Sequence, residues 1–296
     1  AADEGIRLLK IAKSTSPVPI DAFAEPAAWQ AASSETVAEF SAACFYMAKE
    51  LRRRDDSVPI GLIHSNWGGS AARAWLSPAS VRRLYGDKAL AQLQTYARDP
   101  FAATQQFVPQ WFDWWRKEDS GREPWKNSAI LDWQPIPEFS FWNEWTGTGL
   151  DKQPHANVWL RQSLTLTAGQ AKQEGLLSIG AIDDMDLTFV NGNPVGYTFG
   201  WGVERTYRVP PEFLRAGENE ILIAANNSWD TGGFFAGPDR LFFTPAGGAP
   251  PLPLGADWEY SIAPVSDVPP RAPWDANAGL GVMHNAMVAP LGPIRL

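Results

Sequence analysis

Cysteine and histidine are scarce in this sequence of 296 residues, and their scarcity excludes several kinds of chemistry. The single cysteine, Cys44, cannot form a disulfide within the chain, and it falls in an apolar helical pattern where a small buried thiol is usual. The histidines, His64, His155 and His284, form no His-Glu-x-x-His motif, and no cysteine pair or spaced cluster of ligating residues accompanies them. The sequence therefore predicts no metal site.

Long apolar runs and clustered positive charge are also missing. No segment approaches the roughly 18 consecutive apolar residues that a membrane span needs. With 25 Lys and Arg against 33 Asp and Glu, the formal net charge is −8. We therefore expect neither a membrane nor a nucleic acid as partner, since phosphate binding requires a basic surface. The one basic cluster, at residues 52–54, lies at a predicted helix end, where cations interact favourably with the helix dipole.

Common catalytic motifs are absent as well. A Gly-x-Ser-x-Gly elbow is not formed, because Gly68-Gly69-Ser70 is followed by two alanines, and no phosphate-binding glycine loop or dinucleotide fingerprint occurs. Residues 183–186, Asp-Asp-Met-Asp, lack the glycine and terminal glutamate of a calcium loop, so we interpret them as a polar turn between strands. We interpret His64 as a structural or wall residue rather than a base.

The first hundred residues carry the pattern of an α/β layer. Residues 35–54 place apolar side chains at spacings of three and four, which predicts an amphipathic helix packed on a sheet. After a polar turn, the apolar run at residues 60–63 predicts a buried strand of a parallel sheet. Residues 77–98 predict a second helix, with Pro78 in its first turn.

The stretch after residues 60–63 is the most informative. Asn66, Trp67, Gly68 and Gly69 follow the strand, at the end where open α/β sheets bind ligands. Two adjacent glycines let backbone N–H groups approach a ligand without an intervening Cβ. From the spacing alone, the same residues are more typical of a tight turn from strand to helix.

Tryptophan is concentrated in the middle of the chain. Seven lie within 35 residues, interleaved with Pro, Asp, Glu and Lys. They are Trp111, Trp114, Trp115, Trp125, Trp133, Trp142 and Trp145. Indole faces suit the apolar C–H faces of sugar rings, but bulky rings also cover irregular connectors. The sequence leaves both interpretations open.

Beyond residue 157 the hydrophobic period changes from helical to alternating. Short strand-like runs separated by Gly, Pro, Asn and Asp predict an antiparallel sandwich, and Asn191-Gly192 predicts a tight hairpin within it. We expect four parts: an α/β part (1–105), a Trp-rich connector (106–156), an inserted sandwich (157–245) and a linker that returns to the α/β domain (246–296).

Taken together, these segments resemble the sialate O-acetylesterase-like family of SGNH hydrolases, which includes plant-polysaccharide acetylesterases. The resemblance is carried by residues 6–9, 37–42, 58–70, 190–192 and 285–291, and Trp67-Gly68-Gly69 is its most specific motif. It implies an α/β fold with an SGNH-type parallel sheet, incomplete in this chain, and an inserted jelly-roll sandwich.

The resemblance also implies an activity and a set of residues. Gly68 or Gly69 would donate a backbone N–H to the oxyanion, and Trp67, Arg73 and Trp75 would shape the substrate pocket. No metal or organic cofactor is implied. The family's Gly-Gln-Ser-Asn, Gln-Gly-Glu-Ser and Asp-x-x-His segments are absent. The nucleophile and base would therefore lie on a second polypeptide, the remaining fragment of the same esterase.

We therefore expect an interior piece of a carbohydrate O-acetylesterase that removes acetyl groups from sialic acid or from a plant polysaccharide such as xylan. Strand-like segments at both ends of the chain agree with an interior piece. The substrate class implies a periplasmic or extracellular location. Two alternatives stay open: a non-catalytic carbohydrate-binding module and a scaffold in which the sandwich is only a spacer.

Overall fold

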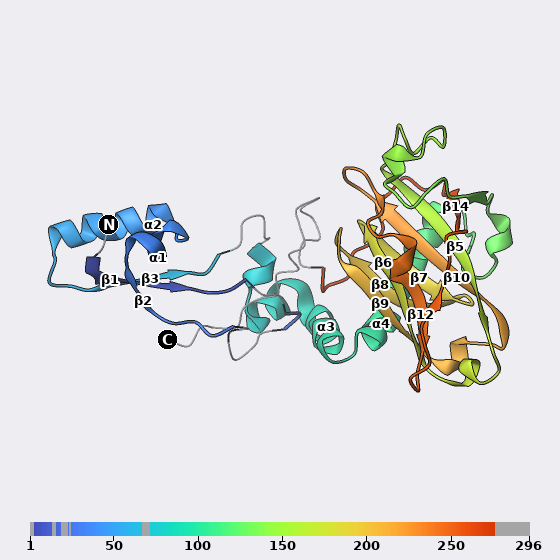
Figure 1. The fold of residues 1–296 in the computed structure, drawn as a ribbon, viewed down its shortest axis with the longest axis horizontal. Helices are drawn as coiled ribbons and strands as arrows, with labels where there is room; N and C mark the ends of the chain where they lie inside the picture. The colour runs from blue at the N-terminus through green and yellow to red at the C-terminus, as the bar shows by residue number, and fades with distance from the viewer. Residues whose placement is uncertain (1–2, 14–15, 19–22, 24, 67–71, 276–296) are drawn as a thin grey trace.

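The computed structural model describes residues 3–13, 16–18, 23, 25–66 and 72–275. Figure 1 shows a small α/β unit at one end of the molecule, a larger β-sandwich at the other, and helix α3 (Pro78–Arg98) between them. Helix α4 (Pro100–Glu118) follows and lies against the sandwich (Figure 1). Among the described residues, no helix combines the length and the apolar content needed to cross a bilayer.

The small unit is a three-stranded sheet covered by helices. Its strands are β1 (Asp3–Lys10), β2 (Gln30–Ala32) and β3 (Ile60–His64), in the order β2-β1-β3. Strand β2 pairs antiparallel with β1, and β3 pairs parallel with β1. The core of the unit contains six buried residues: Ile6, Leu8, Ala32, Phe45, Ala48 and Leu62.

The helix expected over residues 35–54 is divided in two. Helix α1 (Ser34–Ala38) is capped by Ser33, and helix α2 (Ala42–Arg54) begins after Ser41, whose hydroxyl accepts from the backbone N–H of Cys44 (3.4 Å). A serine whose side chain satisfies a first-turn N–H favours a helix start at that point. The apolar spacing that predicted one helix therefore continues across the break between α1 and α2, where Ser41 caps the start of α2.

The expected fold class is correct only in part. Most strand pairings among the described residues are antiparallel, and β1 with β3 is the one parallel pair among them. An SGNH-type parallel sheet is therefore not shown by the structure. The second predicted helix is confirmed as α3, with Ser77 as its cap and a non-helical residue, Gly86, within it.

The sandwich consists of two antiparallel sheets. One has the order β4-β14-β5-β10-β7-β8, and the other has the order β11-β6-β12-β13, with β9 paired to β6. Its strands are β4 (Gln134–Pro135), β5 (Ala156–Leu166), β6 (Gly175–Asp183), β7 (Met185–Val190), β8 (Asn193–Phe199), β9 (Glu204–Val209), β10 (Gly217–Asn227), β11 (Gly233–Phe234), β12 (Leu241–Pro245), β13 (Leu252–Pro253) and β14 (Glu259–Ile262). The described residues also form the short 3-10 helices η1 (Ala72–Trp75), η2 (Ser128–Ile130), η3 (Trp142–Glu144), η4 (Gln170–Lys172), η5 (Pro211–Phe213) and η6 (Pro238–Arg240).

Three of these strands, β4, β13 and β14, come from outside the expected range 157–245. Strand β14 pairs with β5, where Glu259 faces Arg161, and β4 pairs with β14. The expected connector also begins inside α4, which spans residues 100–118. The division of the chain into domains stays a prediction, but the six-stranded sheet includes segments on both sides of the predicted insertion.

The tryptophans of residues 111–145 are mainly packing residues. Five of the seven are buried, with at most 3% of their surface exposed, and Trp114 and Trp133 are half-buried. On α4, Trp111 stacks on Trp115 with ring centroids 5.3 Å apart, and both rings contact Trp159 of β5. The interpretation in which these rings cover neighbouring structure therefore describes most of them.

The hairpin predicted at Asn191-Gly192 is confirmed. Strands β7 and β8 pair antiparallel on either side of it, and the two residues have φ angles of 48° and 81°. Two consecutive positive φ angles are typical of the two-residue turn that matches strand twist.

We predict that Gly196→Ala destabilises the sandwich. A Cβ built at Gly196 overlaps the ring of Tyr207, which is buried in the core between the sheets. Overpacking of this kind costs about 1–3 kcal/mol of unfolding free energy. Urea unfolding measures the loss. The matched control is Gly169→Ala, where the nearest atom is 4.0 Å away; equal midpoints for the two variants contradict the prediction.

Candidate functional site

The first candidate site is the loop after β3. Strand β3 ends at His64, which is in register with Lys10 at the end of the parallel strand β1. The loop therefore leaves the carboxyl end of a parallel pair. Trp67, Gly68 and Gly69 lie outside the described residues, so their predicted roles stay predictions.

The two remaining predicted site residues follow this loop in η1. The side chain of Arg73 is outside the described part of the structure, and Trp75 is half-buried. Neither residue's predicted contact with substrate is tested by these positions.

His64 packs as a structural residue at the end of β3. Its ring meets Phe40 edge to face, with centroids 5.1 Å apart, and its backbone carbonyl accepts from the N–H of Ile11 (3.0 Å). The buried Nδ1 atom has no hydrogen-bond partner among the described residues. A histidine that acts as a base in a triad needs a group that orients its second nitrogen. The described residues supply none.

A shallow cavity of about 260 Å³ lies at the same end of β1. Its lining residues are Leu8, Lys10, Gln30, Glu35, Thr36, Glu39 and Phe40. Lys10 Nζ lies 3.7 Å from Glu39 Oε2, and Thr36 Oγ1 donates to the carbonyl of Ala31 (2.9 Å). The one hydroxyl in the lining is therefore engaged in the helix cap, and the cavity holds no nucleophile paired with a base.

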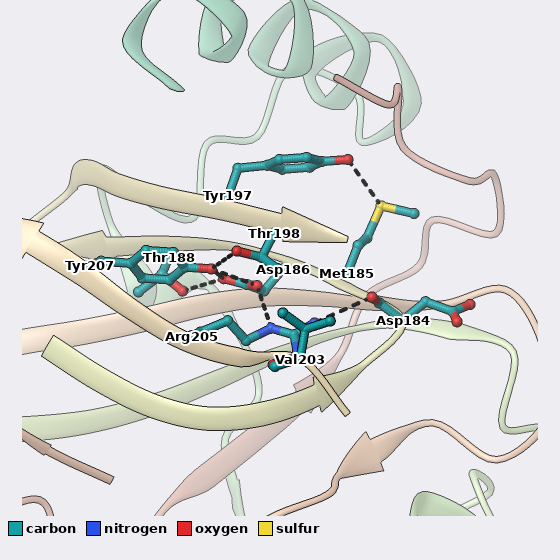
Figure 2. Close-up of polar contacts among 9 residues, drawn as sticks. All are labelled: Asp184, Met185, Asp186, Thr188, Tyr197, Thr198, Val203, Arg205 and Tyr207. Atoms are coloured by element: carbon teal, nitrogen blue, oxygen red, sulfur yellow. Dashed lines mark hydrogen bonds and ion pairs between the residues drawn. The ribbon is translucent and has the colours of Figure 1, made fainter. Parts of the chain in front are cut away.

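A second polar cluster is buried inside the sandwich (Figure 2). Arg205 Nε donates to Asp186 Oδ1 (2.9 Å), and both side chains are fully buried. Thr188 Oγ1 and Tyr207 Oη donate to Asp186 Oδ2 (2.7 and 2.8 Å), and Tyr207 Oη lies 2.9 Å from Thr198 Oγ1. Asp186 is thus inside β7 and not in a turn, which corrects our interpretation of residues 183–186 at that position.

The electrostatics of this cluster favour a structural role. Burial raises the pKa of the Asp186 carboxyl, while the charge of Arg205 and the hydrogen bonds to Asp186 oppose that rise. Burial and the neighbouring Asp186 raise the pKa of Tyr207 well above its usual value. Both oxygens of Asp186 are occupied by donors within the cluster, so they have no capacity left for a substrate.

A third cluster lies where the chain crosses from one sheet to the other between β6 and β7. Asp184 Oδ2 accepts from the backbone N–H and the hydroxyl of Ser228 (3.0 and 2.9 Å), and its backbone carbonyl accepts from the N–H of Gly200 (2.7 Å). Asp183 accepts from the N–H of Gly232 and shares a hydrogen bond with Asp184. This crossover, the one residue between the strands, confirms the predicted polar turn at Asp184.

Burial raises the pKa of Asp183 to about 7, and the charge of Asp184 adds to the rise. Two carboxyls in contact share a proton more easily than they both ionise. The Asp183–Asp184 pair therefore holds a proton near neutral pH. Its hydrogen bonds connect it to Gly200, Ser228 and Gly232 in the neighbouring loops.

Aromatic side chains occupy the loops that this carboxyl pair joins. Phe235 contacts Phe141 and Trp201, with ring centroids 4.7 and 4.9 Å apart. Trp229 follows Ser228 directly. Sequence reasoning missed this group; the signal was present as aromatic residues flanked by Gly, Ser and Asp, in Gly200-Trp201-Gly202 and Ser228-Trp229-Asp230.

No protein-family model and no curated protein matches this chain. Among solved structures, a novel carbohydrate acetylesterase from Xanthomonas citri is similar over 29% of this chain and 19% of its own, with 38% identity and a TM-score of 0.25. A β-D-glucuronidase from Dictyoglomus thermophilum is similar over 33% of this chain and 16% of its own (22% identity, TM-score 0.29). A β-glucuronidase from Ruminococcus gnavus is similar over 51% and 26% (15% identity, TM-score 0.32).

These neighbours are carbohydrate-processing hydrolases, and each similarity covers about a quarter or less of the neighbour's length. TM-scores of this size do not establish a shared fold. Across the described part of the chain, no three His, Cys, Asp or Glu side chains are grouped so that they could hold a metal ion.

We predict that Asp186→Asn is strongly destabilising. The substitution leaves the guanidinium of Arg205 buried without a carboxylate, which costs about 3–5 kcal/mol. Urea unfolding measures the effect. The matched control is Glu174→Gln, which removes the half-exposed partner of Arg208 and is expected to cost less than about 1 kcal/mol. A loss of similar size in both variants contradicts the proposed importance of burial.

We also predict that stability falls as pH rises from 5 to 8. Asp183 keeps its proton in the folded state up to a pKa of about 7, whereas the unfolded carboxyl loses it near pH 4. The folded state therefore holds the extra proton in this window, and raising the pH removes stability on the order of 2 kcal/mol.

Unfolding curves at pH 5 and pH 8 check this prediction in the parent and in Asp183→Asn, which should flatten the dependence. Asp151→Asn is the control, because hydrogen bonds from Gly147 and Gly149 lower the pKa of that exposed carboxyl. The stability that the ionised Asp151 carboxylate contributes is lost only at pH values below the range from 5 to 8. An unchanged slope in Asp183→Asn contradicts the assignment.

Proposed function

We propose that this chain is part of a carbohydrate O-acetylesterase. It supplies the oxyanion glycine, a portion of an SGNH-type α/β domain and the inserted sandwich. The serine, aspartate and histidine come from polypeptide outside this sequence, which lacks their motifs. The substrate is an acetylated sialic acid or a plant polysaccharide such as xylan, and the location is periplasmic or extracellular.

The observation that carries the proposal is the parallel pairing of β1 with β3. The pair ends at Lys10 of β1 and His64 of β3. His64 precedes Trp67, Gly68 and Gly69 by three to five residues. Ligand sites of open α/β sheets lie at this end of the strands. The Trp-Gly-Gly motif thus follows the structural context that the family resemblance requires of it.

The proposed chemistry is acyl transfer to water in two steps. The serine oxygen attacks the acetyl carbonyl while the histidine takes its proton, and the carbonyl oxygen becomes an oxyanion. A backbone N–H of Gly68 or Gly69 donates to that oxyanion, which stabilises the transition state by about 3 kcal/mol. The sugar hydroxyl leaves with the proton, and water then releases acetate by the same route.

A second candidate function is carbohydrate binding without catalysis. It is favoured by one observation, the exposed aromatic side chains Trp229 and Phe235 at the β6–β7 end of the sandwich. The two functions are compatible, because binding modules commonly accompany hydrolytic sites on the same chain.

The test of the first function compares the isolated chain with the chain combined with the rest of the proposed esterase. The isolated chain should hydrolyse neither p-nitrophenyl acetate nor acetylated xylan, and a serine-directed fluorophosphonate should not label it. Activity should appear when the chain is combined with polypeptide that carries the Gly-Gln-Ser-Asn and Asp-x-x-His segments. In that complex, Gly68→Pro or Gly69→Pro should lower kcat by about 10²–10³-fold, because proline has no N–H to donate.

The matched controls are Gly68→Ala and Gly69→Ala, which keep the N–H. Thermal unfolding of each complex separates loss of folding from loss of the donor. Stoichiometric labelling of the isolated chain overturns the placement of the nucleophile. Full kcat in both proline variants overturns the oxyanion role.

A further inference from the structure

We call four aromatic residues at the β6–β7 end of the sandwich the aromatic platform: Phe141, Trp201, Trp229 and Phe235. The Phe235 ring contacts Phe141 and Trp201, and Trp229 follows Ser228, which binds Asp184. Trp229 is 53% exposed and Phe235 is 38% exposed. Most other indoles of the sandwich and of α4 are buried. Among the described residues of the sandwich and α4, an exposed indole is therefore the exception, and contiguous exposed apolar patches mark interaction sites.

The platform is held in place by hydrogen bonds at its base. The carboxylate of Asp184 holds Ser228, which precedes Trp229, and its carbonyl holds Gly200, which precedes Trp201. Phe235 donates its backbone N–H to the carbonyl of Ala181 (2.8 Å). The backbones of Trp229, Trp201 and Phe235 are thus each within one residue of a hydrogen bond to residues 181–184. Rings fixed before binding lose little conformational entropy when a ligand stacks on them.

We propose that the aromatic platform is a binding site for a neutral sugar chain, whose rings stack on Trp229 and Phe235. Indole and phenyl faces match the apolar C–H faces of a pyranose.

The charges at the platform set the class of sugar. Asp184 binds Ser228, which precedes Trp229, and Asp230 follows Trp229. Arg205, the cation nearest to Asp184 in the hydrogen-bond network, is occupied by Asp186 and by the Asp184 carbonyl. A carboxylate-bearing sugar would therefore meet negative charge, so a neutral oligosaccharide is favoured over an acidic one.

The polar and glycine residues between the platform's aromatic residues favour a sugar over a protein as the partner. Its rings alternate with polar and glycine residues, whereas a stable protein interface has a continuous apolar core. The inference does not depend on the esterase activity, since binding is measured without turnover. The two proposals can fail separately.

The test uses the full chain and isothermal titration calorimetry with three neutral probes, xylohexaose, cellohexaose and mannohexaose, and one acidic probe, trimeric α2,8-linked sialic acid. At least one neutral probe should bind, and the acidic probe should bind at least 10-fold more weakly. Trp229→Ala and Phe235→Ala should each weaken the bound neutral probe by 10-fold or more.

Trp29→Ala is the matched control, because this indole is 49% exposed but lies in the small α/β unit over Gly61. It should bind the probe as the parent does, and thermal unfolding confirms that each variant is folded. The proposal is overturned if no neutral probe binds, if the acidic probe binds more tightly, or if the platform variants bind like the parent. If the probe no longer binds when the chain is combined with the polypeptide that carries the catalytic segments, the platform is a contact surface for that polypeptide. This result also overturns the proposal.

Discussion

The sandwich depends on a charge pair that water does not reach. Removing Arg205 and Asp186 from solvent is costly, and the pair is tolerated only because every nearby donor and acceptor is used. Thr188 lies on β7 and Thr198 on β8, in one sheet, while Arg205 and Tyr207 lie on β9, in the other. The network therefore crosses the core and fixes the position of one sheet against the other.

The same network extends to the outside of the molecule. Arg205 donates to the carbonyl of Asp184 (3.3 Å), and that carbonyl also accepts from Gly200. The side chain of Asp184 in turn holds Ser228. The loops that carry the exposed aromatics are thus attached, through Asp184, to the buried charge pair of the core. Their geometry follows from the core and not from the loops' own sequence.

Local patterns predicted the elements that are stabilised by neighbours in sequence. Residues 60–63 were correctly expected to form a strand, Ser77 and Pro78 to begin a helix, and Asn191-Gly192 to form a hairpin. Helix α4 was missed, although Phe107, Trp111 and Trp115 repeat every four residues on its buried side. Pro109 and the density of aromatic residues concealed this period, because both are typical of irregular segments.

What the sequence could not predict is contact between distant segments. The bond from Ser228 to Asp184 joins residues 44 positions apart, and Glu259 pairs with Arg161 across 98 positions. No spacing rule reports such pairs in a single sequence. The predicted oxyanion loop differs from these contacts. Its Trp67-Gly68-Gly69 motif was recognised from neighbouring residues, whereas the serine, aspartate and histidine motifs that it would act with do not occur in the sequence.

Helix α2 shows why the small unit differs from the sandwich. The spacing of Met47 and Leu51 assigned them to the face that packs on the sheet, but Phe45 and Ala48 occupy that face, and Met47 and Leu51 are 53% and 47% exposed. Helix α2 therefore presents apolar side chains on two sides. Among the described residues, only the sheet of the small unit covers α2. This is the surface that an α/β unit needs if further polypeptide completes it, as the proposed division of the catalytic groups requires.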